Sequence, residues 1–266
     1  MRSLFGCVLI VPLVIPVMVE AQEAMNTPAA TQPGVGRTVV RERAWWHSFD
    51  NGTDLLHAAT DVTYGLTKDF SVNLNVPFNV ELNDPGDNEE GFGDLHVMGK
   101  YRFLLHNPGP VDTLRASALF GVDIPTYDDD QSSDAFNSMV GVVATRIHGR
   151  HGVNGSLRYK LNYDGQASPE LPGGSKADTL WTEGAYLYRL TPGEYTAETT
   201  FSTYLVFESS LVYETNGDAH LWVAPGFLYE AQSWAAGVSI ILPAWQELDH
   251  RADLDVGVGF DLRFLF

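Results

Sequence analysis

The sequence has almost no cysteine: Cys7 is the single one among 266 residues. It lies at the start of an apolar N-terminal run, whereas the lipid-bearing cysteine of a lipoprotein follows such a run. Because this run is expected to be removed on export, the mature chain has no disulfide, no thiol nucleophile and no cysteine-ligated metal site.

Basic residues are also scarce. Lys and Arg number 16 against 34 Asp and Glu, so the formal net charge is −18. A protein that binds nucleic acid presents a basic face to phosphates, so a nucleic-acid partner is not expected. Hydrophobic residues make up 44% of the chain, which is too many for a disordered acidic protein.

Long hydrophobic runs are missing after the N-terminus. A transmembrane helix needs about 20 predominantly apolar residues, and no segment beyond residue 21 has them. The mean hydropathy of −0.09 excludes a bundle of transmembrane helices. It is compatible with a transmembrane β-barrel, whose residues alternate between lipid and lumen and average to neutral.

The N-terminus is organised as a secretory signal peptide. Residues 1–3 form a short basic region through Arg2, and residues 4–19 form an apolar run interrupted by Pro12 and Pro16. Val19 and Ala21 are the small residues that a signal peptidase reads. We expect cleavage after Ala21. Residues 22–36, rich in Ala, Thr, Gln, Pro and Gly, are expected to be a flexible periplasmic segment without a core, followed by a barrel over residues 37–266.

Apolar and polar residues alternate with a period of two along the rest of the chain. Residues 70–82, 153–164 and 253–266 show the pattern most clearly. Such segments are roughly twice the usual 5–6 residues of a soluble strand and match the 9–11 residues or so that cross a bilayer. Because backbone groups in lipid must all be paired, the sequence predicts an all-β, transmembrane antiparallel up-and-down β-barrel.

Twelve strands are expected, and ten to fourteen are compatible with the pattern. They are residues 38–49, 54–66, 70–82, 94–105, 112–126, 137–149, 152–164, 178–190, 195–211, 218–231, 234–244 and 253–266. Short connections alternate with long ones, as periplasmic turns and outer loops do in such barrels. The even number places both ends in the periplasm.

Four stretches resemble one family of outer-membrane barrels, the MetA-pathway phenol-degradation family. They are YGLTKDFSV at residues 64–72, residues 91–103, residues 120–126 and residues 257–264. The resemblance implies an outer-membrane, transporter-like barrel, and some members are linked to uptake of aromatic compounds. These motifs are structural, so they carry the fold better than the solute.

The C-terminal strand ends in the generic signal that the outer-membrane assembly machinery reads. Phe260, Leu262, Phe264 and Phe266 place an apolar residue at every second position up to the last one. The expected partners are therefore this machinery, outer-membrane lipids and lipopolysaccharide, and a small-molecule solute.

Charges on the polar faces are unevenly distributed. The predicted basic wall consists of Lys100, Arg102, Arg115, Arg146, Arg158 and Lys160, with Asp123 among them. The predicted acidic wall consists of Glu183, Glu198, Glu208, Glu230, Asp255 and Asp261, with Arg189 and Arg263 among them. Either the walls border a wet pore for small solutes, or they touch, pair and plug the lumen. Twelve strands lie between the filled interior of eight-stranded barrels and the open channel of sixteen-stranded ones.

Other polar and aromatic residues receive structural interpretations. Acidic residues at 84–94 and 128–134 form solvated outer loops, with divalent-cation binding or bridging to lipopolysaccharide as alternatives. Aromatic residues near strand ends are expected to form interfacial belts, with ligand stacking as the alternative; they include Trp181, Trp222, Trp234 and Trp245.

Enzymatic activity is not expected. Adjacent His47 and Ser48 superficially resemble the active strand of outer-membrane phospholipase A, but a base and nucleophile on one strand face must be two residues apart. Asp249 and His250 could suggest a protease pair, but both lie in one short polar loop and no second carboxylate pair is evident. No histidine has metal-ligand spacing, so catalytic, metal and cofactor sites are all expected to be absent.

These observations predict a passive outer-membrane channel for small solutes. The resemblance implies aromatic or other hydrophobic solutes, whereas the polar lumen favours hydrophilic ones. The alternatives are a closed structural or adhesive barrel and, third, a barrel hydrolase.

Processing can be tested directly. We expect the mature protein to begin at Gln22, because Val19-Glu20-Ala21 is the well-formed cleavage site beside the apolar run. Intact-mass spectrometry of the membrane fraction checks this, and a mass that retains residues 1–21 would contradict it.

Overall fold

The computed structural model describes residues 22–82, 89–109, 111–125, 131–163 and 171–266. The predicted signal peptide and most acidic residues of the two predicted outer loops lie outside the described residues. Within the described residues, no helix is long and apolar enough to cross a membrane.

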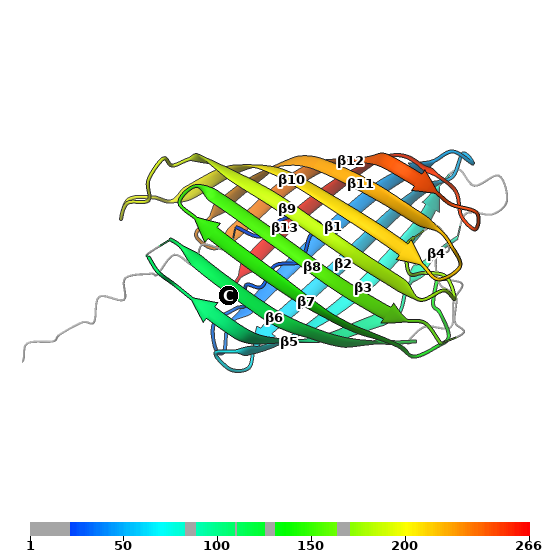
Figure 1. Ribbon diagram of the computed structural model, residues 1–266, viewed down its shortest axis with the longest axis horizontal. Coiled ribbons are helices and arrows are strands. Elements are labelled where there is room, and N and C mark those ends of the chain that lie inside the picture. The colour runs from blue at the N-terminus through cyan, green and yellow to red at the C-terminus, as the bar shows by residue number, and fades with distance from the viewer. Residues whose placement is uncertain (1–21, 83–88, 110, 126–130, 164–170) are drawn as a thin grey trace, which may run out of the picture.

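Twelve long antiparallel strands and one short strand form a closed barrel in the described part of the chain (Figure 1). They are β1 (Thr38–Phe49), β2 (Asp54–Gly65), β3 (Phe70–Leu82), β4 (Glu90–Phe92), β5 (Leu95–His106), β6 (Thr113–Ile124), β7 (Asn137–His148), β8 (His151–Leu161), β9 (Thr179–Thr191), β10 (Phe201–Glu214), β11 (Ala219–Ala231), β12 (Trp234–Glu247) and β13 (Leu254–Leu265). The predicted fold is confirmed, and the twelve predicted strands correspond to the twelve long ones.

The barrel closes where the first and last strands meet. β1 pairs with β13 along its length, with Ala44 opposite Phe260. The Thr38 amide donates to the Phe266 carbonyl at 3.1 Å, and the Phe266 amide donates to the Thr38 carbonyl at 2.8 Å. Among the described strands, this closure leaves no long strand with an unpaired edge, which a sheet in lipid requires. We call the end of the barrel where Thr38 meets Phe266 the terminal end, and the opposite end the loop end.

β4 and β5 share one position in the sheet beside β3, with a break between them. β5 pairs with the first half of β3, and β4 continues that line toward the loop end, with Phe92 opposite Phe78. Pro77 lies at the break and has no amide hydrogen for the ladder. The Gly93 amide instead donates to the Pro77 carbonyl at 3.1 Å, so the wall stays bridged there.

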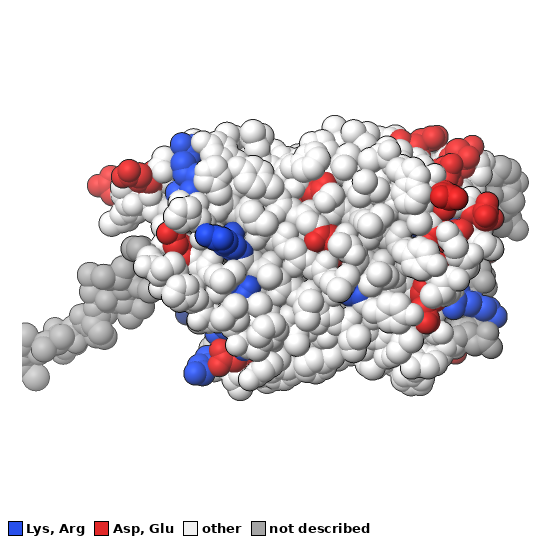
Figure 2. All heavy atoms as spheres, in the orientation of Figure 1, with Lys and Arg blue, Asp and Glu red and all other residues white. Residues whose placement is uncertain are grey.

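The two faces of the wall differ in polarity. Large apolar side chains such as Phe120, Phe207 and Phe260 are about half exposed on the outer face. Uncharged atoms cover most of the middle of the side shown in Figure 2. The inner face carries buried polar groups such as Asn75 and Asp261. This outward apolar band is what a bilayer accommodates.

The segment expected to be flexible lies inside the barrel, so that prediction is wrong. Ala24 and Ala30 are fully buried, and Met25 is 2% exposed. Ala24 and Met25 pack with Leu187, Tyr204 and other inner-face residues in one apolar cluster. The chain enters the lumen near the start of β8, turns back inside, and leaves beside Gly65 to begin β1. We call residues 22–33 the inner segment.

The facing of the strands can be tested with two arginines. Val142, on the outer face of β7, is 48% exposed, whereas Ser210 lies on the inner face of β10 opposite Glu183. We expect Val142→Arg to lower the free energy of unfolding by about 2–4 kcal/mol, the cost of an arginine facing mid-bilayer lipid. Ser210→Arg meets carboxylates instead and is expected to cost less. Urea titration in liposomes measures both, and equal losses would contradict the assigned faces.

Candidate functional site

The lumen is the candidate site, and the tip of the inner segment lies at its centre. Glu208, on β10, accepts hydrogen bonds from the backbone amides of Asn26 at 2.8 Å and Thr27 at 2.7 Å, and from the Asn26 side-chain amide at 2.8 Å. From the other side of the lumen, Trp45 Nε1 donates to Asn26 Oδ1 at 2.7 Å. Three hydrogen bonds from the tip converge on this one side chain, so Glu208 is the main anchor of the tip.

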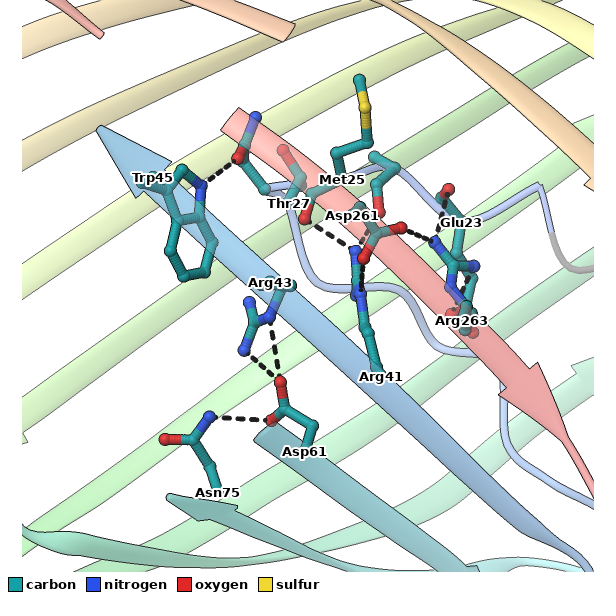
Figure 3. Close-up of polar contacts among 12 residues, drawn as sticks. Glu23, Met25, Thr27, Arg41, Arg43, Trp45, Asp61, Asn75, Asp261 and Arg263 are labelled. Carbon is teal, nitrogen blue, oxygen red and sulfur yellow. Dashed lines mark hydrogen bonds and ion pairs between the residues drawn. The ribbon is translucent and has the colours of Figure 1, made fainter. Parts of the chain in front are cut away.

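A charged network holds the first part of the segment (Figure 3). Arg263 contacts Glu23 at 3.0 Å and Asp261 at 2.8 Å. Arg41, which also pairs with Asp261, donates to the backbone carbonyls of Ala24 at 2.9 Å and Met25 at 2.7 Å. These cations therefore satisfy both a wall carboxylate and peptide groups of the segment.

The returning part of the segment is held by polar contacts as well. Lys100 Nζ donates to the carbonyls of Ala29 at 2.8 Å and Thr31 at 3.1 Å. The Ala30 amide donates to Thr145 Oγ1 at 2.8 Å. Side chains predicted to line a pore thus bind the backbone of the chain's own N-terminal segment.

Two glycines make room for the segment. A Cβ on Gly226 would lie 2.4 Å from Met25 Cε, and a Cβ on Gly237 would lie 2.5 Å from Met25 Sδ. The Met25 side chain fills the space over both wall positions, so a side chain at either position would have to displace it.

Most of the predicted lumenal charges lie on the inner face. These are Lys100, Arg102, Arg115, Arg158, Lys160, Asp123, Glu183, Glu208, Glu230 and Asp261, as the alternating burial of their strands indicates. Arg102 lies at the terminal end, where it pairs with Asp69 in the β2–β3 turn. The predicted terminal aromatics, including Phe260 and Phe264, face outward.

Three predicted pore-lining residues are placed elsewhere, which corrects the prediction. Arg146 lies opposite Leu114 and Val153 on the outer face of β7 and is exposed. Glu198 precedes β10 in an exposed turn, because that strand begins at Phe201 rather than at residue 195. Asp255 is exposed because the register with β1 slips beside it, and a bulge of this kind reverses the alternation.

The charges pair locally, not as two facing walls. Arg158 on β8 contacts Glu183 on neighbouring β9 at 2.8 Å, and Lys160 contacts Asp123 at 2.8 Å. The structure therefore combines features of both predicted alternatives. Charges are paired, as in a plugged barrel, but the inner segment rather than the opposite wall occupies the lumen.

A cavity of about 280 Å³ lies on the loop-end side of the tip. Asn26 and Thr27 border it, and so do Leu171 and Pro172 of the β8–β9 connection. Its remaining lining is rich in rings, contributed by Trp45, His47, His57, Trp181 and Trp222. The cavity offers a small, largely aromatic chamber next to the residues that hold the tip.

The interfacial-belt prediction is wrong for two of the four tryptophans and stays a prediction for the other two. Trp234 and Trp245 are 41% and 45% exposed. Trp181 and Trp222 line the cavity. The sequence did indicate the lumenal position of Trp181, because it lies two residues before lumenal Glu183 on the same strand and therefore on the same face. The role of Asn26 had no such signal, because the segment has no periodicity.

The residues weighed for catalysis are not brought together as a catalytic pair. His47 is buried on the inner face, and Ser48 follows it on the opposite face of β1. Among the described residues, no cluster of three or more His, Cys, Asp or Glu could hold a metal ion.

Polar contacts join two connections at the loop end. Asp218 accepts hydrogen bonds from the Asp249 amide at 2.8 Å and pairs with His250 Nδ1 at 3.0 Å. The hydrogen bond to Asp218 raises the pKa of His250 above its ordinary value of 6.5. Burial alone would raise the pKa of Asp218, but contacts with His250, the Asp249 amide and Arg251 keep it below its ordinary value.

Comparisons with known proteins agree with this architecture. The model of a family described as "Putative MetA-pathway of phenol degradation" matches residues 37–262, which excludes the inner segment. An outer membrane channel from Pseudomonas putida is 12% identical, with a TM-score of 0.55 over 87% of this chain and 96% of its own. The beta domain of the Bordetella autotransporter BrkA is 12% identical, with a TM-score of 0.49 over 87% of this chain and 100% of its own. No curated protein matches the sequence.

The contact between Asp218 and His250 makes the loop end sensitive to pH. Because the folded pKa of His250 is raised, its stabilising contribution is complete below pH 6.5 and is lost as the pH rises through the folded pKa. We expect Asp218→Asn to return that pKa toward 6.5, as an NMR titration of the histidine ring would show. Asp112→Asn, which alters a carboxylate beside His148 at the terminal end, is the control. An unchanged His250 pKa in Asp218→Asn would contradict the contact.

Proposed function

The chain belongs to the MetA-pathway phenol-degradation family, and from this premise we propose that it is a passive outer-membrane channel for small solutes, closed at rest by its inner segment. The terminal end, with its short turns, faces the periplasm, and the loop end faces outward. The partners are outer-membrane lipids and lipopolysaccharide around the wall, the assembly machinery at the last strand, and the solute in the lumen.

One observation carries the proposal. The inner segment lies inside a wall that is complete without it, since β1 pairs directly with both β2 and β13. The segment can therefore leave the lumen without breaking any ladder. A polypeptide that adds nothing to the wall but fills its interior has the arrangement of a gate.

The contacts of the segment support reversible closure. Glu208, Arg41 and Lys100 hold it largely through hydrogen bonds to its backbone. Water can replace such bonds when the lumen is wet, so the net free energy per bond is only about 0.5–3 kcal/mol. The same charged side chains would then line a hydrated passage.

The lining supports solutes with an aromatic ring. The polar inner wall alone would suit hydrophilic solutes. The aromatic cavity lies between the loop end and the tip, so an entering solute meets Trp45, Trp181 and Trp222 before the gate. Family membership points the same way, since the family is described by phenol degradation.

The second candidate is a closed structural barrel without transport. It is favoured by the buried network of Arg41, Asp261, Arg263 and Glu23, which fixes the segment firmly. The two candidates differ in whether the barrel conducts after the segment is released.

Conductance of the refolded protein in planar bilayers separates the candidates. Glu208→Gln removes the carboxylate that anchors the tip. We expect the free energy of the closed state relative to the open state to become less favourable by about 1.4 kcal/mol, which is a tenfold rise in open probability. Glu183→Gln is the matched control, because Glu183 also borders the cavity but pairs with Arg158. A variant lacking residues 22–33 should conduct continuously. If that variant is folded, as its electrophoretic mobility before and after heating would show, and remains silent, the channel proposal is wrong.

A further inference from the structure

The first residue of the inner segment is enclosed by the barrel wall. Gln22 has no exposed surface, and its carbonyl accepts a hydrogen bond from Asn154 Nδ2 at 3.2 Å. A Cβ on Gly152 would lie 2.5 Å from Gln22 Oε1, so the Gln22 side chain fills the space over that glycine. The backbone amide of Gln22 donates to the carboxylate of Glu230 on β11. The nitrogen of Gln22 therefore lies inside the lumen, against a carboxylate of the wall.

Glu230 is a buried carboxylate whose hydrogen bonds are incomplete. The Tyr204 hydroxyl donates to it, as the Gln22 amide does. Its Oε1 atom is buried and has no hydrogen-bond partner among the described residues. A buried carboxylate is costly unless it is hydrogen-bonded and paired with a cation. This position therefore favours a further donor that carries a positive charge.

The cations around Glu230 are shared with other carboxylates. Arg263 contacts Asp261 at 2.8 Å and Glu23 at 3.0 Å (Figure 3), and its charge also acts on Glu230. Arg41 pairs with Asp261 as well. The three carboxylates of this group thus share two guanidinium groups, which leaves one negative charge in excess.

Removal of the signal peptide would supply the missing charge. Hydrolysis of the bond between Ala21 and Gln22 leaves the new carboxylate on the signal peptide and converts the Gln22 amide nitrogen into an amine. An α-amino group is largely protonated at neutral pH, and an ammonium group has three donors. Because this nitrogen already lies against Glu230, the cation forms in place, and no molecule has to reach the buried Oε1 atom.

We propose that the α-ammonium group of mature Gln22 forms an ion pair with Glu230, and that this pair stabilises the inner segment in the lumen after the signal peptide is removed. The pair rests on the cleavage expected after Ala21, and its effect on closure rests on the proposed channel function. Processing and closure are thereby coupled, because the precursor has a neutral peptide group where the mature chain has a cation.

A double-mutant cycle on the exported, mature protein tests the pair. Glutaminyl cyclase, acting on the unfolded chain, joins the amine to the side-chain amide carbon of Gln22 and releases ammonia, which removes the positive charge. Glu230→Gln removes the negative charge and keeps the shape of the side chain. Urea titration in liposomes gives the unfolding equilibrium constant of all four proteins. We expect cyclisation to raise this constant about tenfold in the wild type and by less than about twofold in Glu230→Gln. Equal effects in both backgrounds would overturn the ion pair.

Two further proteins keep this test specific. Glu198→Gln, in the exposed turn before β10, is the matched control and should respond to cyclisation as the wild type does. An alanine inserted before Gln22 moves the ammonium group by about 3.8 Å and leaves every wall side chain intact. We expect it to cost as much stability as cyclisation does. Intact-mass spectrometry establishes the first residue of each protein. A wild type that begins at another residue, or that has already lost ammonia, would overturn the proposal.

Conductance in planar bilayers distinguishes this inference from the channel proposal. Cyclised wild-type protein should open about ten times more often than untreated protein, the same factor as its loss of stability. An unchanged open probability, in a protein that conducts once residues 22–33 are removed, would overturn the role of the pair in closure. A protein that shows the coupling but never conducts has the pair without the channel. A protein that conducts without residues 22–33 but shows no coupling is a channel without this pair.

Discussion

The structure depends on one constraint, the pairing of backbone hydrogen bonds around a wall that faces lipid. An unpaired amide or carbonyl in hydrocarbon costs several kcal/mol, so the sheet must close. The last residue meets the first strand, with reciprocal hydrogen bonds between Phe266 and Thr38. Even at the proline in β3, the Gly93 amide reaches the Pro77 carbonyl, so the wall is bridged where the ladder is interrupted.

Closure with twelve long strands imposes a second constraint, because the interior of the barrel must then be filled. Eight-stranded barrels are filled by their own side chains, whereas barrels of sixteen or more strands keep a channel. Here the wall turns many polar and charged side chains inward, and they would be costly to bury unpaired. The inner segment satisfies them with peptide groups, as Lys100 and Glu208 show. It also contributes a small apolar cluster around Met25.

The tip of the segment and the aromatic cavity share the same residues. Trp45 donates a hydrogen bond to Asn26, Glu208 accepts hydrogen bonds from Asn26, and both residues border the cavity. A molecule in the cavity would therefore contact the groups that hold the tip. Through this shared border, occupancy of the cavity and position of the segment would influence each other, and such coupling is reciprocal for equilibrium binding.

The sequence by itself determined the class of fold and nearly all of the wall. A period of two over long segments predicts a barrel, since hydrophobic side chains must face lipid at every second position. Most strand bounds follow from where that period stops, although β10 begins at Phe201 rather than at residue 195. The facing of residues such as Arg158 and Asp261 follows from the alternation along their strands. Even β1, whose pattern is mixed, was located at the predicted residues, Thr38–Phe49.

Only the tertiary structure decided what occupies the lumen and which residues depart from the alternation. The alternation of faces along a strand does not predict a register slip, so Asp255 was placed on the wrong face. Arg146 is exposed near the end of its strand, where the local sequence pattern is the same as that of a lumenal residue. Residues 22–33 are small and polar without periodicity, so their sequence does not distinguish a segment in water from one against a polar wall. That choice depends on Glu208, Arg41 and Lys100, which lie on three separate strands and meet the segment together only once the barrel has closed.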